Sequence, residues 1–127
     1  MEKERLNKNF LDEFRDCDFS RIRETKIFLV GSIRFKDYFI QIESILQIRY
    51  KKLVAICSVD GLLNKIKFNN HEWDKLQEIA IRKLIDQEAI LVLDVENYIG
   101  EQSREEIDYF SKILKKPVYY FSDLKNA

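Results

Sequence analysis

The sequence contains few residues that could hold a metal ion. It has two cysteines, Cys17 and Cys57, which lie far apart, and a single histidine, His71. A zinc centre needs several such ligands at short, regular spacings, so none can be assembled from this set. We therefore expect no metal and no cofactor, and we expect both cysteines to be reduced residues in or near the core.

Long apolar runs and an excess of charge of one sign are also missing. No segment of about 20 apolar residues occurs, and the first ten residues, MEKERLNKNF, lack the apolar run of a signal peptide. Lysine plus arginine and aspartate plus glutamate both number 22. This balance gives no general attraction to nucleic acid or to anionic lipid. The sequence therefore predicts a cytoplasmic protein that binds neither membranes nor nucleic acid.

The 127 residues are 46% apolar and 35% charged, which is typical of one globular domain. Short apolar runs alternate with segments whose apolar residues recur at helical spacing. Strands are expected at residues 26–31, 52–59, 89–95 and 117–121, helices at about 35–49, 71–86 and 103–115, and loops at 60–70 and 96–102. This alternation implies right-handed parallel crossovers. It predicts a three-layer α/β fold, a Rossmann-like or flavodoxin-like open parallel sheet of four or five strands with helices on both faces.

An N-terminal extension, residues 1–25, precedes the predicted α/β domain, residues 26–127. Its apolar residues recur at helical spacing and predict an amphipathic helix over residues 2–15. These apolar residues are Leu6, Phe10, Leu11 and Phe14. Because such a face is too apolar to remain in water, we expect it to pack on the helices of the sheet or on a second subunit.

One of the three glycines, Gly31, ends the first expected strand in the sequence VGSIR. Ligands of an open α/β sheet bind beyond the carboxyl ends of the strands, where this turn lies. Glycine lets the backbone approach a ligand, and the Ser32 hydroxyl and Arg34 guanidinium suit a phosphate. The alternative is a glycine turn with a serine N-cap and a solvated arginine. The motif is neither GxGxxG nor a P-loop.

A second candidate segment, residues 94–110, follows the third expected strand. Gly100 lies in its loop, and Ser103 and Glu106 have the three-residue spacing of a capping box. A capping box would explain both side chains without any function. A carboxylate at this place would also face the same crevice as Gly31, because the carboxyl ends of neighbouring parallel strands meet at one sheet edge. Both interpretations remain open at this point.

The segments VGSIRFKDYF and LVLDVENYIGEQSREEIDYF resemble those of the nucleoside 2-deoxyribosyltransferase-like superfamily. This superfamily includes the 2′-deoxynucleoside 5′-phosphate N-hydrolases, which share a Gly-Ser-Ile-Arg turn after the first strand. The resemblance covers residues 26–121, nearly everything beyond the N-terminal extension. It implies a small-molecule nucleoside or nucleotide as the substrate, and a homo-oligomer of two or more subunits.

The resemblance also implies roles for individual residues. Glu106 would be the catalytic nucleophile that attacks the anomeric carbon of the sugar, and Asp94 would polarise a sugar hydroxyl or the leaving base. Ser32 and Arg34 would hold the 5′ side of the substrate, so these two side chains and Glu106 should converge on one pocket. The other implied substrate-binding residues are Gly31, Ile33, Tyr98, Gly100 and Ser103.

The sequence departs from the superfamily pattern at three positions. Ala80 stands where a supporting aspartate is common, Glu88 replaces a second aspartate, and Phe110 replaces a small residue near the nucleophile. Either another residue supplies the missing acid, with His71 and Asp86 nearby in sequence, or catalysis has been lost. The sequence therefore predicts an N-glycosidic-bond enzyme, with a catalytically inactive nucleotide-binding or protein-interaction module on the same fold as the alternative.

Overall fold

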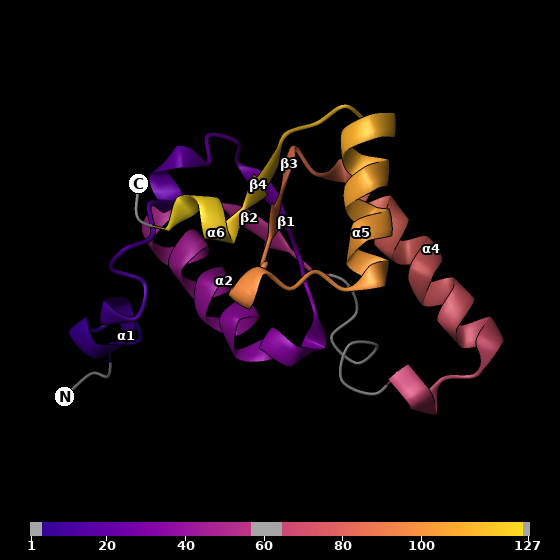
Figure 1. Ribbon diagram of the computed structural model, residues 1–127, viewed down its shortest axis with the longest axis horizontal. Helices are drawn as coiled ribbons and strands as arrows, with labels where there is room; N and C mark the ends of the chain where they lie inside the picture. Colours follow the sequence, from indigo (N-terminus) through magenta and orange to yellow (C-terminus); the bar gives the residue numbers. More distant parts are fainter. Residues whose placement is uncertain (1–3, 57–64, 126–127) are drawn as a thin grey trace.

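The computed structural model describes residues 4–56 and 65–125, which form one four-stranded sheet with helices around it (Figure 1). The strands are β1 (Lys26–Val30), β2 (Leu53–Ala55), β3 (Ala89–Val92) and β4 (Val118–Tyr120). They lie in the order β2-β1-β3-β4, and each neighbouring pair is parallel. The predicted open parallel α/β sheet is confirmed. Residues 57–59 of the second expected strand lie outside the described residues.

The helices follow the strands along the chain, as the alternation of patterns predicts. The α-helices are α1 (Lys8–Asp12), α2 (Lys36–Tyr50), α4 (Asn70–Asp86), α5 (Glu101–Asp108) and α6 (Phe121–Leu124). Short 3-10 helices occur at η1 (Phe19–Arg21), η2 (Ile33–Phe35), η3 (Lys65–Lys67) and η4 (Val95–Asn97), and a π-helix, η5 (Tyr109–Ile113), continues α5. Residues 60–64 of the loop predicted over residues 60–70 lie outside the described residues, and the rest contains η3 and the first residue of α4.

Two apolar cores cover the two faces of the sheet, because successive strand residues point to opposite faces. One face of β1 and β3 packs against α2, α6 and the N-terminal segment. The other face packs against α4, α5 and η5, which lie side by side in Figure 1. On β1, Ile27 and Leu29 face the first core, whereas Phe28 and Val30 face the second. The predicted helices on both faces are therefore confirmed.

The N-terminal helix is shorter than predicted, with five residues in α1 instead of the fourteen of residues 2–15. The Asn7 side chain accepts a hydrogen bond from the backbone N–H of Phe10, which caps the helix at this point. After α1, a further turn brings Phe14 into the core, where it is 4% exposed. Because Phe10 and Phe14 are buried within the chain, their apolar character is accounted for without a second subunit.

The segment after α1 is fixed to the C-terminal part of the chain. Cys17 forms an isolated antiparallel bridge with Lys125, and the N–H of Asp18 donates to the carbonyl of Leu124 at 2.9 Å. Arg21 donates from Nη1 to the carbonyl of Asp123 at 2.7 Å. The extension and the α/β domain therefore share one core and one set of backbone contacts. The sequence patterns did not predict α6, whose Asp123 and Leu124 supply two of these three partners.

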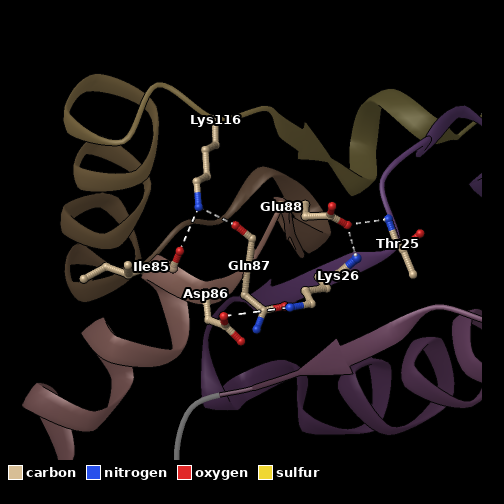
Figure 2. Close-up of polar contacts among 7 residues, drawn as sticks. All are labelled: Thr25, Lys26, Ile85, Asp86, Gln87, Glu88 and Lys116. Atoms are coloured by element: carbon tan, nitrogen blue, oxygen red, sulfur yellow. Dashed lines mark hydrogen bonds and ion pairs between the residues drawn. The ribbon is translucent and has the colours of Figure 1, made fainter.

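A second set of polar contacts closes the amino ends of β1 and β3, opposite the expected ligand edge (Figure 2). Lys116 donates from Nζ to the carbonyl of Ile85 at 2.7 Å and of Gln87 at 2.8 Å. These carbonyls end α4 and would otherwise lack partners within the helix. An ammonium group at this position also complements the helix dipole. Lys116 thus fixes the end of α4 to the segment that leads into β4.

Glu88 belongs to the same edge, so it lies away from the carboxyl ends of the strands. Its carboxylate accepts hydrogen bonds from the backbone N–H of Lys26 at 2.9 Å and of Thr25 at 3.0 Å (Figure 2). These two bonds, that from Lys26 first, lower the pKa of the Glu88 carboxyl below its usual value of 4.5. Glu88 therefore holds the start of β1 and has a structural role at this position.

We expect Lys116→Met to lower the free energy of unfolding by roughly 1–2 kcal/mol, because it keeps the alkyl chain but leaves two helix-end carbonyls without their charged donor. Urea denaturation followed by circular dichroism measures this change. The matched control is Lys112→Met, whose exposed pair with Asp108 at 3.7 Å should contribute less than about 0.5 kcal/mol. Equal midpoints for the two variants would contradict the role of Lys116.

Candidate active site at the carboxyl edge of the sheet

The strand order defines where a ligand would bind. β2 lies on one side of β1, and β3 and β4 lie on the other side. The strand order therefore changes direction between β1 and β3, which is the topological switch point of the sheet. In open α/β sheets, ligands bind at such a switch point, beyond the carboxyl ends of the strands. Gly31 follows β1 here, and Asp94 follows β3 two residues after its end. Both α2 and α5 begin at this end of the sheet (Figure 1).

Close packing explains why residue 31 is a glycine, and the sequence alone did not reveal this. A Cβ atom at this position would lie 3.2 Å from Leu93 Cβ, 3.2 Å from the ring of Phe39 and 3.3 Å from the Leu93 carbonyl. The backbone of Gly31 has no positive φ, so close approach and not conformational freedom requires the glycine here. The absence of a side chain at Gly31 therefore lets the ends of β1 and β3 approach closely, and a Cβ atom there would require its neighbours to shift by a few tenths of an ångström.

The turn after Gly31 contains an internal hydrogen bond, and it also contacts the loop after β3. The Ser32 hydroxyl accepts a hydrogen bond from the Arg34 N–H at 3.2 Å, which is a local capping role. The Arg34 guanidinium lies 4.3 Å from the centre of the Tyr98 ring. A cation over the face of a tyrosine ring is attracted to it, which favours this position of the guanidinium and its N–H groups. No described residue accepts a hydrogen bond from these N–H groups. Ile33 lies in η2, and its side chain is outside the description.

The loop after β3 is a tight turn that presents Tyr98. The N–H of Tyr98 donates to the carbonyl of Val95 at 3.1 Å, and the two residues between them are left-handed, with φ of 57° at Glu96 and 61° at Asn97. Asparagine tolerates this conformation, whereas glutamate rarely adopts it. The turn brings the Tyr98 ring to 6.2 Å from that of Phe35. The two predicted loops, after β1 and after β3, are therefore in direct contact.

Asp94 is buried and has a specific structural partner. Its Oδ1 accepts a hydrogen bond from the N–H of Ser122 at 2.9 Å, and its Oδ2 accepts one from the Ser122 hydroxyl at 2.6 Å. This pair joins the end of β3 to the start of α6. Both carboxylate oxygens are engaged, so the catalytic role predicted for Asp94 stays a prediction beside a clear structural one. Sequence spacing could not identify Ser122, which lies 28 residues away.

The capping box predicted at Ser103 and Glu106 is wrong. Helix α5 begins two residues earlier, at Glu101, with Gly100 as its N-cap and no side-chain cap. Ser103 is therefore inside the helix, where it is 6% exposed. The chain does contain a capping box, but at the start of α4, where Asn69 accepts from the N–H of Glu72 at 2.8 Å. The structural explanation for Glu106 that the sequence allowed is thereby removed.

Glu106 lies on the buried stripe of α5. Ser103, Glu106, Ile107 and Phe110 follow the spacing i, i+3, i+4 and i+7, and Ile107 and Phe110 pack in the second core beside Val30. The carboxylate of Glu106 is partly buried, and no described residue donates a hydrogen bond to it. Burial, with a smaller effect of the neighbouring Glu105, raises the pKa of Glu106 from 4.5 to about 7.

The helix changes its hydrogen-bond pattern directly after Glu106. The N–H of Tyr109 donates to the carbonyls of both Glu105 and Glu106, and the N–H of Leu114 then donates to the carbonyl of Tyr109, five residues back. Single π-turns of this kind occur often at functional sites. No sequence pattern predicted η5, because the π and α forms place the same apolar residues on one face.

The structure thus joins part of the predicted site directly. Arg34 and Tyr98 contact each other, and a Cβ atom at Gly31 would meet Leu93, the residue before Asp94. Glu106 projects from the helix that covers the end of β1 on one face, but no contact among the described residues joins it to Ser32 or Arg34. Three cavities lined by described residues lie beside the N-terminal segment, and none of the three includes Glu106.

Two further observations concern the described residues as a whole. No group of three or more histidine, cysteine, aspartate or glutamate side chains among them could hold a metal ion. None of the helices in residues 4–56 and 65–125 is long and apolar enough to cross a membrane. Comparison of the chain with protein-family models, with curated proteins and with solved structures finds no match.

The raised pKa of Glu106 predicts how stability depends on pH. The folded protein holds the proton more tightly than the unfolded chain, so its free energy of unfolding falls as pH rises from about 4.5 to about 7. Because glutamine does not ionise, the Glu106→Gln variant should not lose this stability as pH rises. We expect the variant to match wild type at pH 4 and to exceed it by up to about 3 kcal/mol at pH 8. Urea unfolding at both pH values, with Glu105→Gln as the control, tests this. A constant difference across pH would exclude a raised pKa.

The contact at Gly31 predicts a second change in stability. We expect Gly31→Ala to lower the free energy of unfolding by roughly 1–3 kcal/mol, because the new methyl group forces the ends of β1 and β3 apart. Gly100→Ala is the matched control, since a Cβ there meets nothing within 4 Å and φ is −68°. It should stay within about 1 kcal/mol of wild type. Thermal denaturation compares them, and equal losses would argue against the close approach.

Proposed function

We propose that this chain is an N-glycosidic-bond enzyme that cleaves or transfers the deoxyribosyl group of deoxynucleosides or of their 5′-monophosphates. The observation that carries the proposal is Glu106, a partly buried carboxylate on the core-facing stripe of α5, without a described hydrogen-bond donor. The resemblance of the Gly31–Arg34 turn and of the α5 segment to the deoxyribosyltransferase-like superfamily supplies the substrate class.

The position of Glu106 suits a nucleophile better than a structural residue. A desolvated carboxylate without a partner lowers stability, and such groups concentrate at sites where chemistry requires them. Because burial raises the pKa of Glu106 to about 7, its ionised form is more basic, and more nucleophilic, than an exposed glutamate. Both protonation forms are populated near neutral pH, and the ionised form is the one that attacks.

The proposed reaction consists of two displacements. A carboxylate oxygen of Glu106 bonds to the anomeric carbon as the bond from that carbon to the base nitrogen breaks. The electron pair leaves with the base, which takes a proton from the solvent. Water, or the nitrogen of another base, then attacks the same carbon, and the ester bond breaks to regenerate the carboxylate. The proton of the attacking group passes to the solvent.

The turn after β1 would hold the 5′ side of the substrate. The Arg34 guanidinium is held on the Tyr98 ring, and its edge N–H groups can bind two phosphate oxygens at once. Stacking before binding reduces the side-chain entropy that binding would otherwise cost. Ser32, whose oxygen already accepts from the Arg34 N–H, can still donate its hydroxyl proton.

The second candidate function is a nucleotide-binding module without catalysis. Two observations favour it. Ala80, at the position where the superfamily commonly has an acid, is 6% exposed and cannot move a proton. Asp94 uses both carboxylate oxygens on Ser122. Neither residue therefore offers a second acid beside Glu106.

Activity assays distinguish these functions. Wild type is incubated with a panel of deoxynucleosides and deoxynucleoside 5′-monophosphates, and released base is measured by chromatography. We expect Glu106→Gln to lower the rate by at least about a thousandfold, because a neutral amide is a poor nucleophile. Glu105→Gln, one residue away on the exposed side, is the control that should retain activity. For wild type, kcat/KM should rise with pH through about 7.

The outcomes separate the two proposals. If Glu106→Gln releases base at the wild-type rate, Glu106 is not the nucleophile. If wild type releases no base, but a deoxynucleotide raises its melting temperature, the binding module is supported. In that case Arg34→Ala should abolish the shift for monophosphates, because the guanidinium supplies the phosphate contact.

A further inference from the structure

A cavity of about 460 Å³ lies between the N-terminal segment and the C-terminal half of α2, which are neighbours in Figure 1. Its size falls in the range of cavities that bind small molecules. None of the residues that line it belongs to the candidate active site. The chemistry of this cavity is therefore independent of Glu106 and of the function proposed for it.

The floor of the cavity is apolar. Phe14, Phe19 and Ile45 line it and are 4%, 2% and 2% exposed. The Phe14 and Phe19 rings contact each other with centres 6.4 Å apart, and Phe19 contacts the Tyr50 ring at 6.3 Å. Leu11 adds a further apolar side chain. Because these floor side chains are already buried, the apolar surface open to a ligand comes from the half-buried Leu11 and Tyr50, which favour an alkyl or aromatic group over a purely polar ligand.

The rim of the cavity is positively charged. Lys8, Arg15 and Arg49 line it with exposed side chains, against a single acid, Asp12. The whole chain carries 22 basic and 22 acidic residues, so three cations against one acid is a local concentration. No described residue forms an ion pair or a hydrogen bond with the side chain of any of these three cations. Their charges are therefore available to an anionic ligand.

The walls are held in place by contacts outside the cavity. Cys17, in one wall, forms the backbone bridge with Lys125, and the opposite wall is the regular helix α2. A second cavity of about 730 Å³ shares Leu11 and Arg49 with the first and continues along α2. A ligand would therefore meet a largely preformed groove with room beyond it, which lowers the ordering cost of binding.

We infer that this cavity binds an apolar molecule with one anionic head group. The specific ligand that we propose is a medium-chain fatty acid, bound as its carboxylate. The alkyl chain would lie on Leu11 and Tyr50, above the buried floor, and extend along α2 over Ile48, while Arg15 and Arg49 at the rim would hold the carboxylate. A planar guanidinium can donate two parallel hydrogen bonds to a carboxylate, which an ammonium cannot. Asp12 opposes the head group, so its charge weakens binding.

Calorimetric titration of the whole chain with decanoate tests this inference. Decanol, with the same chain and no charge, should bind at least about tenfold more weakly, because the rim charges then have no partner. The double variant Arg15→Gln/Arg49→Gln should weaken decanoate binding by about tenfold and leave decanol binding unchanged. Asp12→Asn should strengthen decanoate binding by a few-fold. All these side chains are at the surface, so the variants should fold, which circular dichroism checks.

Protection of Cys17 shows where the ligand sits. In a Cys57→Ser background, decanoate at saturation should slow the alkylation of Cys17 severalfold, because Cys17 lines the cavity. Arg82→Gln is the control: it removes a cation from α4, away from the cavity, and should bind decanoate as tightly as wild type. Base release, where present, should be unaffected by the double arginine variant. No heat of binding at about 1 mM decanoate, equal binding of decanol, or unchanged binding by the double variant would overturn the inference.

Discussion

The parallel pairing of β1 with β3 is the contact on which the other features of this protein depend. Ile27 to Val30 pair with Ala89 to Val92, and all eight side chains are at most 3% exposed. Burial on both faces drives this pairing, and it requires helices on each side. The strands can run to their ends in contact because Gly31 leaves room for Leu93. The two loops that follow then start side by side, which allows Arg34 to reach Tyr98.

The strands and long helices could be predicted from sequence because burial imposes a regular pattern there. The contacts that define the candidate site could not. Ser103 and Glu106 match a capping-box spacing, but the helix starts at Glu101, since spacing does not say which polar residue begins a helix. The N-terminal helix was predicted too long because its periodicity continues past the point where Asn7 caps it. The pair of Asp94 with Ser122 depends on tertiary structure, which no local pattern contains.

Three carboxylates of the chain occupy different environments, and two of them have clear structural partners. Glu88 accepts two backbone N–H bonds, which lower its pKa, and Asp94 is bonded twice by Ser122. Glu106 is partly buried with no described donor, and its pKa is raised to about 7. The first two stabilise the ends of strands, whereas the third opposes folding above pH 7. An unfavourable charge that folding retains distinguishes Glu106 from these two residues and is the feature on which its proposed catalytic role depends.

The bridge between Cys17 and Lys125 also constrains the order in which the chain can fold. Residues 17–22 pack in the core against α6, and the N–H of Asp18 needs the carbonyl of Leu124. During synthesis, these residues therefore cannot form their native contacts until partners more than a hundred positions later in the chain have been made. Until then, Phe19 and Ile22 lack part of their burial, which exposes apolar surface on a growing chain. Contacts this distant in sequence slow folding, and the first core can be completed only after residue 125 has been made.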